Sequence, residues 1–449
     1  MITDLIKYFE NKKILILGFG REGQSTYKLV RKYLKDQKIY IADKKENFQN
    51  NYDFLREDKN SVYISGENYL NNLNEFDIIM KSPGISFVGI DTNKFLSKVK
   101  SQLELLLEYF KVFTIGITGT KGKSTTSSLI YKVLQEQNIK TKFLGNIGIP
   151  VFDYIDEIEE NMTIVLEMSS HQLEYMDISP NIAILLNIFE EHLDHYESFE
   201  KYADAKCNIY KFQKNTDYFI YNSDNEVLKN IVKDTNGTTY KVSLKGNENA
   251  NVVKNDENIF INNRIIYNIN EKRNLLGDYN LNNIMFVLAV SEILKLDINQ
   301  TIKSIADFKT LEHRLELVGK YDGVLYYDNS IGTIPEATIE AVKALKQVDT
   351  LIIGGMDRGI DYTGLIEFLN NSTVNNIICM PQTGHDIAKE LKQEKVHIAQ
   401  DLEEAVKTAK KVTKKDMICL LSPAAASYGF FKNFEEKGDL YKKLVRNEI

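Results

Sequence analysis

At 449 residues the chain is too long for one hydrophobic core, and roughly 150 residues per domain predicts three domains. Hydrophobic residues make up 43% and aromatic residues 10% of the chain, which supports packed cores and excludes a disordered protein. The net charge is −7, with basic and acidic residues interspersed, so the composition argues against a nucleic-acid-binding stripe or a face for anionic membranes.

The cysteines and the lack of long apolar runs bear on the cellular setting. Cys207, Cys379 and Cys419 lie far apart without CxxC spacing, which predicts buried reduced thiols rather than disulfides or a structural zinc site. The first residues carry no signal-peptide core, and no segment approaches the ~20 apolar residues of a membrane span. We therefore expect a soluble, cytoplasmic protein.

The first region, from residue 12 to about residue 100, alternates short apolar runs with polar helical stretches. KILILG, KIYIAD, SVYIS and FDIIMKSPG read as buried parallel strands of a small α/β domain. The next stretch, FLSKVKSQLELLLEYF, has apolar positions at helical spacing and no strong breaker. We expect it to bridge two domains, with the first boundary near Ser101.

The glycine-rich turn GFGREG follows the first of these strands. Gly18, Gly20 and Gly23 would let the backbone approach a diphosphate at a helix N-terminus, and Asp43, which ends the next strand, could accept hydrogen bonds from the ligand. This pattern predicts a Rossmann-like nucleotide site. The alternative is a tight turn in a doubly wound fold that binds no nucleotide.

The second α/β region begins with KVFTIGIT and contains GITGTKGKST at residues 116–125. The usual phosphate-loop spelling has glycine where this chain has isoleucine, but the strand before and the helix after provide the required context. Gly119 and Gly122 would let N–H groups converge on phosphate, Lys123 would neutralise charge, and Ser124 or Thr125 would ligate Mg²⁺. The alternative is an incidental Gly-Lys turn.

Acids and histidines follow two later strands of this region. Glu167 closes TIVLE, and the strand IAILLNIF is followed by Glu190, Glu191, His192, Asp194 and His195. The ends of adjacent parallel strands collect catalytic groups, so an oxygen-rich Mg²⁺ site with one imidazole is one interpretation. Solvated surface acids explain several of these residues equally well, and HxxH lacks a third ligand for zinc.

The remaining sequence predicts a β-rich insertion and a third α/β domain. Residues 218–270 show β-type alternation, which we expect to extend the central sheet as a hairpin or meander. After Arg314 the chain again alternates strands and helices. HR at 313–314, DNS at 328–330, GGMDR at 354–358 and SPAAAS at 422–427 end strands or domains, where they would offer donors to a ligand or simply make turns.

Taken together, the motifs resemble the Mur ligase family along nearly the whole chain. GFGREG, KSPGI, GTKGKST, GNIG, LEMSSHQLE, EEHLDHY, HRLE, GGMDRG and LSPAAASYGFFKNFEEKG occur in the family's order, and GTxGKS/T is the family's own phosphate loop. The resemblance implies three α/β domains. They are a Rossmann-like domain for the uridine nucleotide (1–101), a P-loop ATPase-like domain with a β-rich extension (102–311) and a Rossmann-like domain for the amino acid (312–449).

The terminal string most resembles members that add D-glutamate to UDP-N-acetylmuramoyl-L-alanine in peptidoglycan precursor synthesis. The implied reaction passes the γ-phosphoryl group of ATP to the substrate carboxylate, and the amine of D-glutamate then displaces phosphate from the acyl phosphate. The implied cofactors are ATP and two Mg²⁺ ions. The implied partners are these small molecules, with no nucleic acid, and we expect a monomer.

The resemblance also implies residues for each part of the site. Catalysis would use Lys123, Glu167, His192, Lys206 and Asn146. The metal ions would be held by Ser124, Glu167, His192 and a carbamylated Lys206. ATP would contact Gly119, Thr120, Lys121, Gly122, Lys123, Ser124, Thr125, Asn280, Asn283, Arg314 and Asn329. The UDP-substrate would contact Gly18, Gly20, Gly23, Asp43, Lys44, Ser82, Pro83, Gly84, Asn146 and Ser169. D-glutamate would contact Thr333, Arg358, Ser427 and Phe434.

Four departures from the family's pattern stand out. Lys121 replaces a common asparagine and His171 a common aromatic residue. The DNS order at 328–330 inverts the more familiar Asn-Asp-Ser, which leaves open which side chain meets the nucleotide. Arg358 stands where lysine is frequent, so it keeps the charge but changes the donor geometry.

Three other functions fit part of the sequence. A sister ligase or a folylpolyglutamate synthetase shares the phosphate loop and would use another amino acid. A nicotinamide-dependent dehydrogenase would use the GFGREG turn, but the chain shows no evident hydride-transfer site and has a second phosphate loop. A non-enzymatic nucleotide-binding regulator would bind ATP without substrate-dependent hydrolysis; Lys123, Glu167 and His192 argue against it.

Overall fold

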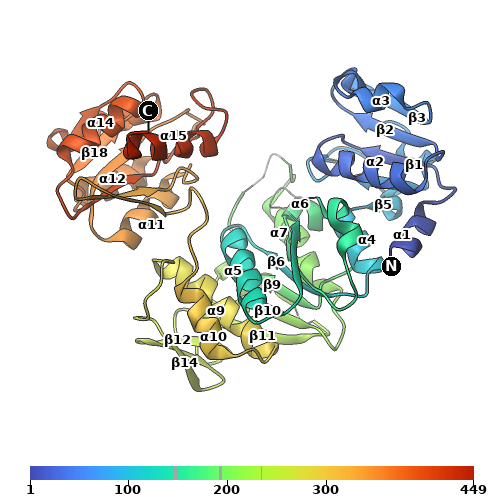
Figure 1. The fold of residues 1–449 in the computed structure, drawn as a ribbon, viewed down its shortest axis with the longest axis horizontal. Helices are drawn as coiled ribbons and strands as arrows, with labels where there is room; N and C mark the ends of the chain where they lie inside the picture. The colour runs from blue at the N-terminus through green and yellow to red at the C-terminus, as the bar shows by residue number, and fades with distance from the viewer. Residues whose placement is uncertain (146–149, 192–194, 234, 449) are drawn as a thin grey trace. The chain divides into compact units, whose positions relative to one another are not determined.

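The computed structural model describes residues 1–145, 150–191, 195–233 and 235–448. The described residues form three β-sheets, each flanked by helices (Figure 1). The chain divides into two compact units. The first consists of Met1–Glu271 and Asn282–Ile305, and the second of Lys272–Leu281 and Ala306–Ile449. The α/β class expected from the sequence is confirmed.

The N-terminal sheet is parallel, with strand order β3-β2-β1-β4-β5. Its strands are β1 Ile14–Leu17, β2 Ile39–Asp43, β3 Ser61–Ser65, β4 Ile78–Lys81 and β5 Val99–Lys100. Its α-helices are α1 Ile2–Phe9, α2 Arg21–Tyr33 and α3 Asp53–Glu57. The first four strands are those predicted from the sequence.

The segment expected to form one bridging helix is instead divided. Val99 and Lys100 add the fifth strand to the N-terminal sheet, and α4 (Gln102–Tyr109) begins only after Ser101. The Ser101 side chain accepts from the backbone of Glu104, whose carboxylate accepts from the backbone of Ser101. This capping box starts the helix at that residue.

The central sheet has the strand order β14-β13-β12-β11-β10-β9-β6-β8-β7. Its strands are β6 Phe113–Thr118, β7 Thr141–Gly145, β8 Thr163–Glu167, β9 Ile182–Leu185, β10 Tyr218–Asn222, β11 Thr238–Ser243, β12 Val252–Asn255, β13 Asn258–Ile261 and β14 Arg264–Asn268. Its helices are α5 Lys123–Glu136, α6 Ser170–Leu173, α7 Phe199–Lys211, α8 Glu226–Ile231, α9 Asp278–Ile293 and α10 Ile298–Ala306.

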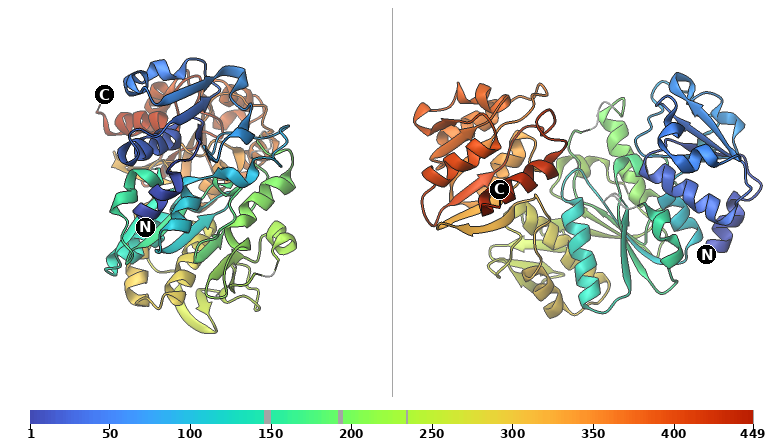
Figure 2. Two further views of the ribbon diagram at one scale, coloured as in Figure 1. Left: turned by 90° about the vertical axis from the view of Figure 1, so that its right-hand side faces the viewer. Right: turned by 45° about the horizontal axis from the view of Figure 1, so that its top comes forward.

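Residues 218–270 extend the central sheet, as the sequence predicted, but the predicted hairpin or meander is confined to β12–β14, because β10 and β11 flank α8 and pair in parallel. β12, β13 and β14 pair antiparallel at one edge, whereas β6 to β11 pair with their neighbours in parallel. Helix α5 packs along β6, β7 and β8 (Figure 2). This packing places the helix N-terminus, and so the phosphate loop, at the carboxyl ends of those strands.

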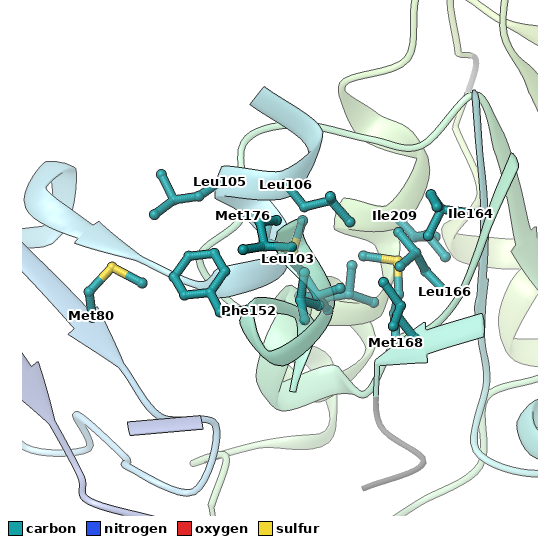
Figure 3. Packing of buried hydrophobic residues seen from close by; sticks show 14 of the residues in the cluster. Met80, Leu103, Leu105, Leu106, Phe152, Ile164, Leu166, Met168, Met176 and Ile209 are labelled. Carbon is teal, nitrogen blue, oxygen red and sulfur yellow. The ribbon is translucent and has the colours of Figure 1, made fainter. Parts of the chain in front are cut away.

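One hydrophobic core joins the N-terminal and central sheets. It contains Met80 from β4, Leu103 and Leu106 from α4, Phe152 from the 3-10 helix Val151–Glu157, and Leu166 from β8, all buried (Figure 3). Because apolar area removed from water stabilises by about 25 cal/mol per Å², this shared packing holds the two sheets together.

The second unit contains a six-stranded sheet with the order β15-β16-β20-β17-β18-β19. Its strands are β15 Glu316–Tyr321, β16 Val324–Asp328, β17 Val348–Ile353, β18 Asn376–Cys379, β19 Val396–Ile398 and β20 Ile418–Leu421. Its helices are α11 Pro335–Leu345, α12 Thr363–Asn371, α13 Thr383–Ala388, α14 Leu402–Val412 and α15 Phe434–Arg446. Only β15 pairs antiparallel.

Two expectations about the whole chain can be compared with the described residues. All three cysteines are buried and none is in a disulfide. Over the same residues, no helix combines the length and the apolar character needed to cross a membrane.

Candidate functional site

The phosphate loop connects β6 to α5 through two glycines with positive φ. Gly119 has φ +155° and Gly122 has φ +90°, conformations that residues with a Cβ rarely adopt. A Cβ on Gly122 would lie 2.6 Å from Oδ1 of Asn283, and one on Gly119 would lie 2.9 Å from Cβ of Leu186. The loop therefore needs glycine at both positions, and it presents the N-terminus of α5 to any bound anion.

Two lysine side chains converge on the loop. Lys123 Nζ donates to the carbonyl oxygens of Gly119 at 2.8 Å and Thr120 at 3.1 Å. Lys206, from α7, donates to the same Gly119 oxygen at 3.1 Å. Burial and the neighbouring charge of Lys123 hold the pKa of Lys206 well below its ordinary value. The two amino groups thus meet at one carbonyl oxygen.

The other loop residues are held by the segment after β9. Thr120 Oγ1 lies 2.9 Å from the hydroxyl of Tyr202, whose pKa burial raises to about 12. Lys121 Nζ pairs with Glu191 at 2.8 Å, and its backbone N–H donates to Asn187 at 2.8 Å. Lys121 is exposed, so the departure from asparagine is accommodated by an ion pair at the surface.

Some of the acids and histidines that follow β8 and β9 lie within the described residues, and others lie outside them. Glu167 ends β8 with 2% of its surface exposed. His195 Nε2 lies 3.2 Å from Oε2 of Glu174, and its ring packs against His171. Asn146, His192 and Asp194 lie outside the described residues. The HxxH pair considered for zinc therefore has one member without a described position.

The glycine-rich turn GFGREG is packed so closely that two of its glycines leave no room for a side chain. Gly18 has φ +88°, and a Cβ there would lie 2.9 Å from Cβ of Ser82. A Cβ on Gly23 would lie 2.1 Å from the Gly18 carbonyl oxygen, whereas Gly20 has open space around it. Asp43 accepts from the backbone N–H of Phe19 at 2.8 Å and thus fastens the loop to the end of β2. This fastening is a use of Asp43 that the sequence did not reveal.

Two cavities in the first unit bring together candidate residues of the UDP-substrate set and two candidate lysines. The larger, about 470 Å³, is lined by six residues of the expected UDP-substrate set. These are Gly18, Gly20, Asp43, Ser82, Pro83 and Gly84. The smaller, about 230 Å³, is lined by Lys123, Ser169, Lys206 and again Pro83 and Gly84. The residues of the KSPGI motif thus border both cavities. Of the expected UDP-substrate residues, Gly23, Lys44 and Ser169 do not line the larger cavity.

In the second unit, three loops converge at the carboxyl ends of β16, β17 and β20. Arg358 donates to the carbonyl oxygen of Thr333 at 3.0 Å. The GGMDRG loop is bridged to the SPAAAS loop through Met356 and Ala426. Ser427 is 3% exposed, and its Oγ has no hydrogen-bond partner among the described residues. Arg358, Thr333 and Ser427 therefore belong to neighbouring loops.

Phe434 begins α15, and its ring lies 6.1 Å from the ring of His313. His313 Nδ1 lies 2.8 Å from Oδ2 of Asp328. Burial alone would lower the pKa of His313, but its hydrogen bond and ion pair with Asp328 raise it. Deeper in this region, Lys437 donates to the carbonyl of Gly354, and burial lowers the pKa of Lys437 to about 7.

The expected ATP-base residues are distributed over both units. Asn283 is in the first unit, and Asn280, Arg314 and Asn329 are in the second. Asn329 is 4% exposed, donates to Ser422 at 2.9 Å and accepts from the backbone of Leu315 at 3.3 Å. The inverted DNS order therefore gives Asn329 a structural use at the end of β16.

Sequence reasoning missed Glu22 and Gln172, which line the larger cavity, and Lys81, which directly precedes the cavity residue Ser82. Lys81 is buried at the end of β4, where it lies 3.6 Å from Glu174. Gln172 in α6, which follows β8 of the central sheet, hydrogen-bonds to Glu22 in α2, which follows β1 of the N-terminal sheet. The S-x-x-Q spacing of Ser169 and Gln172 signals a capping box, so the start of α6 could have been found from the sequence. The pairing of Gln172 with Glu22 could not have been found in this way, because the two residues are 150 positions apart in the sequence.

The fold is α/β, and its first unit carries a phosphate loop and a second glycine-rich loop, each between a strand and a helix. Residues 117–291 match the Mur ligase middle domain, and residues 313–425 match the Mur ligase glutamate ligase domain. The chain belongs to the Mur ligase family.

Individual relatives agree along the full chain. The UDP-N-acetylmuramoylalanine–D-glutamate ligase of Clostridium kluyveri is 34% identical over 463 residues, covering 99% of this chain and 98% of the relative. The enzyme of the same name from Clostridioides difficile is 34% identical over 455 residues, covering 98% and 99%. Among solved structures, the MurF ligase of Thermotoga maritima in complex with ADP has a TM-score of 0.61 at 17% identity, covering 99% of this chain and 100% of its own, a likeness of fold.

Proposed function

We propose that the protein is an ATP-dependent ligase that joins D-glutamate to UDP-N-acetylmuramoyl-L-alanine through an acyl phosphate, in the synthesis of peptidoglycan precursors. The observation that carries this proposal is the meeting of Lys123 and Lys206 at Gly119, in a cavity whose wall includes Pro83 and Gly84 from the nucleotide-binding sheet. The full-length similarity to ligases of that name supports the choice of substrates.

Phosphoryl transfer is assigned to the phosphate-loop cavity. The substrate carboxylate oxygen attacks the γ-phosphorus of ATP, the bond to the bridging oxygen breaks, and ADP leaves. Lys123 would hold charge on the transferring group, together with N–H groups at the start of α5. Thr120 and Lys121 would continue this cradle, with Gly119 and Gly122 allowing the close approach.

The donor set suits Mg²⁺, which prefers oxygen ligands. Ser124 offers a hydroxyl at the start of α5, and Glu167 offers a carboxylate at the end of β8. Thr125 Oγ1 is buried there without a hydrogen-bond partner among the described residues. Two bound Mg²⁺ ions would supply positive charge to the phosphoryl oxygens. His192 would complete the set.

Carbamylation of Lys206 is part of the proposal. Lys206 is 2% exposed and, among the described residues, has no carboxylate within salt-bridge distance. Carbon dioxide would add to its neutral amine, which loses a proton and becomes an anionic carbamate. That anion would offer oxygen ligands to Mg²⁺, and the positive charge of Lys123 would balance it.

The second step would take place where D-glutamate meets the acyl phosphate. Its amine nitrogen attacks the acyl carbon, phosphate leaves, and the nitrogen loses its proton to give the amide. Arg358 would pair with a D-glutamate carboxylate, Thr333 and Ser427 would donate hydroxyls, and Phe434 would border the side chain. The unpartnered Oγ of Ser427 supports this assignment.

The remaining residues receive the expected assignments. The larger cavity would hold the uridine nucleotide, with Asp43 and Lys44 near uracil, Gly18, Gly20 and Gly23 at the diphosphate, and Ser82, Pro83, Gly84, Ser169 and Asn146 toward the muramoyl end. Asn280, Asn283, Arg314 and Asn329 would surround the ATP base and phosphates. We further propose domain boundaries at residues 101 and 311. We propose a monomer, because one chain supplies every assigned residue. We also propose a cytoplasmic location, because both nucleotides are made in the cytoplasm.

The decisive experiment measures ADP and phosphate release with ATP, Mg²⁺ and UDP-N-acetylmuramoyl-L-alanine, with and without D-glutamate. We expect release that needs both substrates and a product heavier by one glutamyl unit. L-glutamate and other amino acids serve as controls. Turnover with another amino acid alone would make the protein a sister ligase. ATP binding without substrate-dependent release would make it a regulator.

A further inference from the structure

Helix α6 lies at the junction of the two cavities and is attached to the N-terminal sheet by side-chain contacts. Ser169, its N-cap, lines the smaller cavity, and Gln172 lines the larger one. Gln172 Nε2 donates to Oε1 of Glu22 at 2.9 Å. Glu22 is in the first turn of α2, directly after the glycine-rich loop, so the contact joins the two halves of the expected substrate site.

The orientation of the Gln172 amide follows from its partners. Its Oε1 accepts from the backbone N–H of Ser169 at 3.0 Å and from Ser169 Oγ at 3.1 Å. Only the nitrogen end is left to face Glu22, and a carboxylate can only accept from it. Gln172 is 5% exposed, so this hydrogen bond to a charged group is largely shielded from water.

A second contact holds the other end of α6. Glu174, which follows the helix, lies 3.6 Å from Lys81 and 3.2 Å from His195. Lys81 is the last residue of β4 and precedes Ser82, Pro83 and Gly84, which border the cavities. The helix is therefore fixed to the N-terminal sheet at both ends, near α2 and near β4.

We propose that the Glu22–Gln172 pair is a positioning device that sets the distance between the diphosphate-binding loop and the cavity in which the substrate carboxylate reacts. The inference rests on the proposed function, because it concerns a substrate that spans both cavities. Such a molecule binds tightly only when its two sites are held at a matching separation. UDP alone or ATP alone occupies one cavity and does not depend on that separation.

Exchanging the two side chains tests the pair. In Gln172→Glu, one oxygen still accepts from Ser169, but the other faces the Glu22 carboxylate, and the like charges repel. Glu22→Gln keeps a hydrogen bond, because its amide oxygen can accept from Gln172. In the double variant Glu22→Gln/Gln172→Glu, the new glutamine donates to the new carboxylate and the contact is restored in reverse.

The affinities of UDP and UDP-N-acetylmuramoyl-L-alanine are measured by calorimetry for each full-length variant. We expect Gln172→Glu to weaken binding of the whole substrate by about tenfold to a hundredfold, the usual effect of losing a charged hydrogen bond, with UDP affinity changed less than about threefold. The double variant should recover to within about threefold of the wild type. In turnover, KM for the uridine substrate should rise while KM for ATP stays constant.

The matched control removes the negative charge from a different contact between the same regions. Lys32 on α2 pairs with Asp156 at 2.6 Å, away from both cavities, so Asp156→Asn should leave all these affinities unchanged. A residue that contacts the substrate directly would not be rescued by changing its protein partner. Lack of rescue in the double variant, or an equal loss of UDP affinity in Gln172→Glu, therefore overturns the positioning assignment.

Thermal unfolding separates failure of this inference from failure of the proposed function. The four proteins form a double-mutant cycle whose melting temperatures require no substrate. If the wild type does not bind UDP-N-acetylmuramoyl-L-alanine, the proposed function fails and the positioning of that substrate fails with it, whatever the cycle gives. If the wild type binds it but the cycle shows no coupling, only the pair is overturned.

Discussion

Replacing Lys206 by methionine should separate the demands of folding from those of catalysis. The side chain is buried on α7. Within the part of the chain that the structure describes, its amino group makes one hydrogen bond, to Gly119, and lies 4.8 Å from the ring of Tyr202. Methionine has a similar length and no polar group. The substitution therefore removes the amine while keeping most of the packing.

The expected stability change is small and in the favourable direction. Burying an amine with incomplete compensation costs about 1–3 kcal/mol, and the lost hydrogen bond contributes about 0.5–1.5 kcal/mol. The difference predicts that Lys206→Met is more stable than the wild type by about 1 kcal/mol. Thermal unfolding in carbonate-free buffer, where the amine is unmodified, measures this difference.

The expected loss of activity is large. An electrostatic group at a reacting phosphoryl centre contributes about 100-fold to 1,000-fold in rate, so kcat should fall by that factor. Lys206→Ala should fall similarly and recover in part when small carboxylates such as formate or acetate replace the carbamate. The exposed Lys211 of the same helix provides the control, because Lys211→Met should change neither quantity by much.

Full activity of unsupplemented Lys206→Met would refute the catalytic assignment. A drop in melting temperature would instead refute the reasoning about the buried amine, because it would mean that Lys206 stabilises the fold. The two readouts are independent.

Three further changes test other parts of the molecule. Lys123→Ala should lower turnover by at least about 100-fold while circular dichroism shows an intact fold; normal turnover by a folded variant would remove Lys123 from the mechanism. Arg358→Ala should raise KM for D-glutamate by about tenfold or more without affecting KM for ATP, and Arg358→Lys should retain most of the affinity; equal KM values for wild type and alanine variant would contradict its pairing with a carboxylate. The pKa of Lys437 is about 7 in the folded protein and about 10.4 in the unfolded chain. Between these pH values the unfolded chain binds more protons, so the free energy of unfolding should rise with pH. Between pH 7 and 9, the free energy of unfolding of Lys437→Met should rise by about 2 kcal/mol less than that of the wild type, as measured by thermal unfolding. The same pH dependence in both proteins would show that Lys437 does not titrate as described.

Much of the fold could be predicted because its signals are local. The strands of the N-terminal sheet are short apolar runs, and the phosphate loop has its strand, glycines and helix within ten residues of sequence. The strand at Val99 was missed, because its two residues form no pattern of their own and pair only with β4. Its existence depends on a distant partner.

The candidate site was predicted unevenly for the same reason. The motifs gave the residue types of both cavities, yet they did not reveal that Lys206 meets Lys123 at one carbonyl oxygen or that Asp43 fastens the glycine-rich loop. They also did not reveal that both ends of the Asn329 amide are held within the protein, by Ser422 and by the backbone of Leu315. Contacts between residues far apart in sequence leave no periodic trace.

The core shared by the N-terminal and central sheets has a consequence for how the chain comes apart. Met80, Phe152 and Leu166 belong to one continuous apolar cluster, although the expected functional boundary falls at residue 101. Cutting the chain there would expose that cluster to water. The two nucleotide-binding sheets should therefore melt in a single cooperative transition, and a fragment ending at that boundary should aggregate rather than persist as a separate domain.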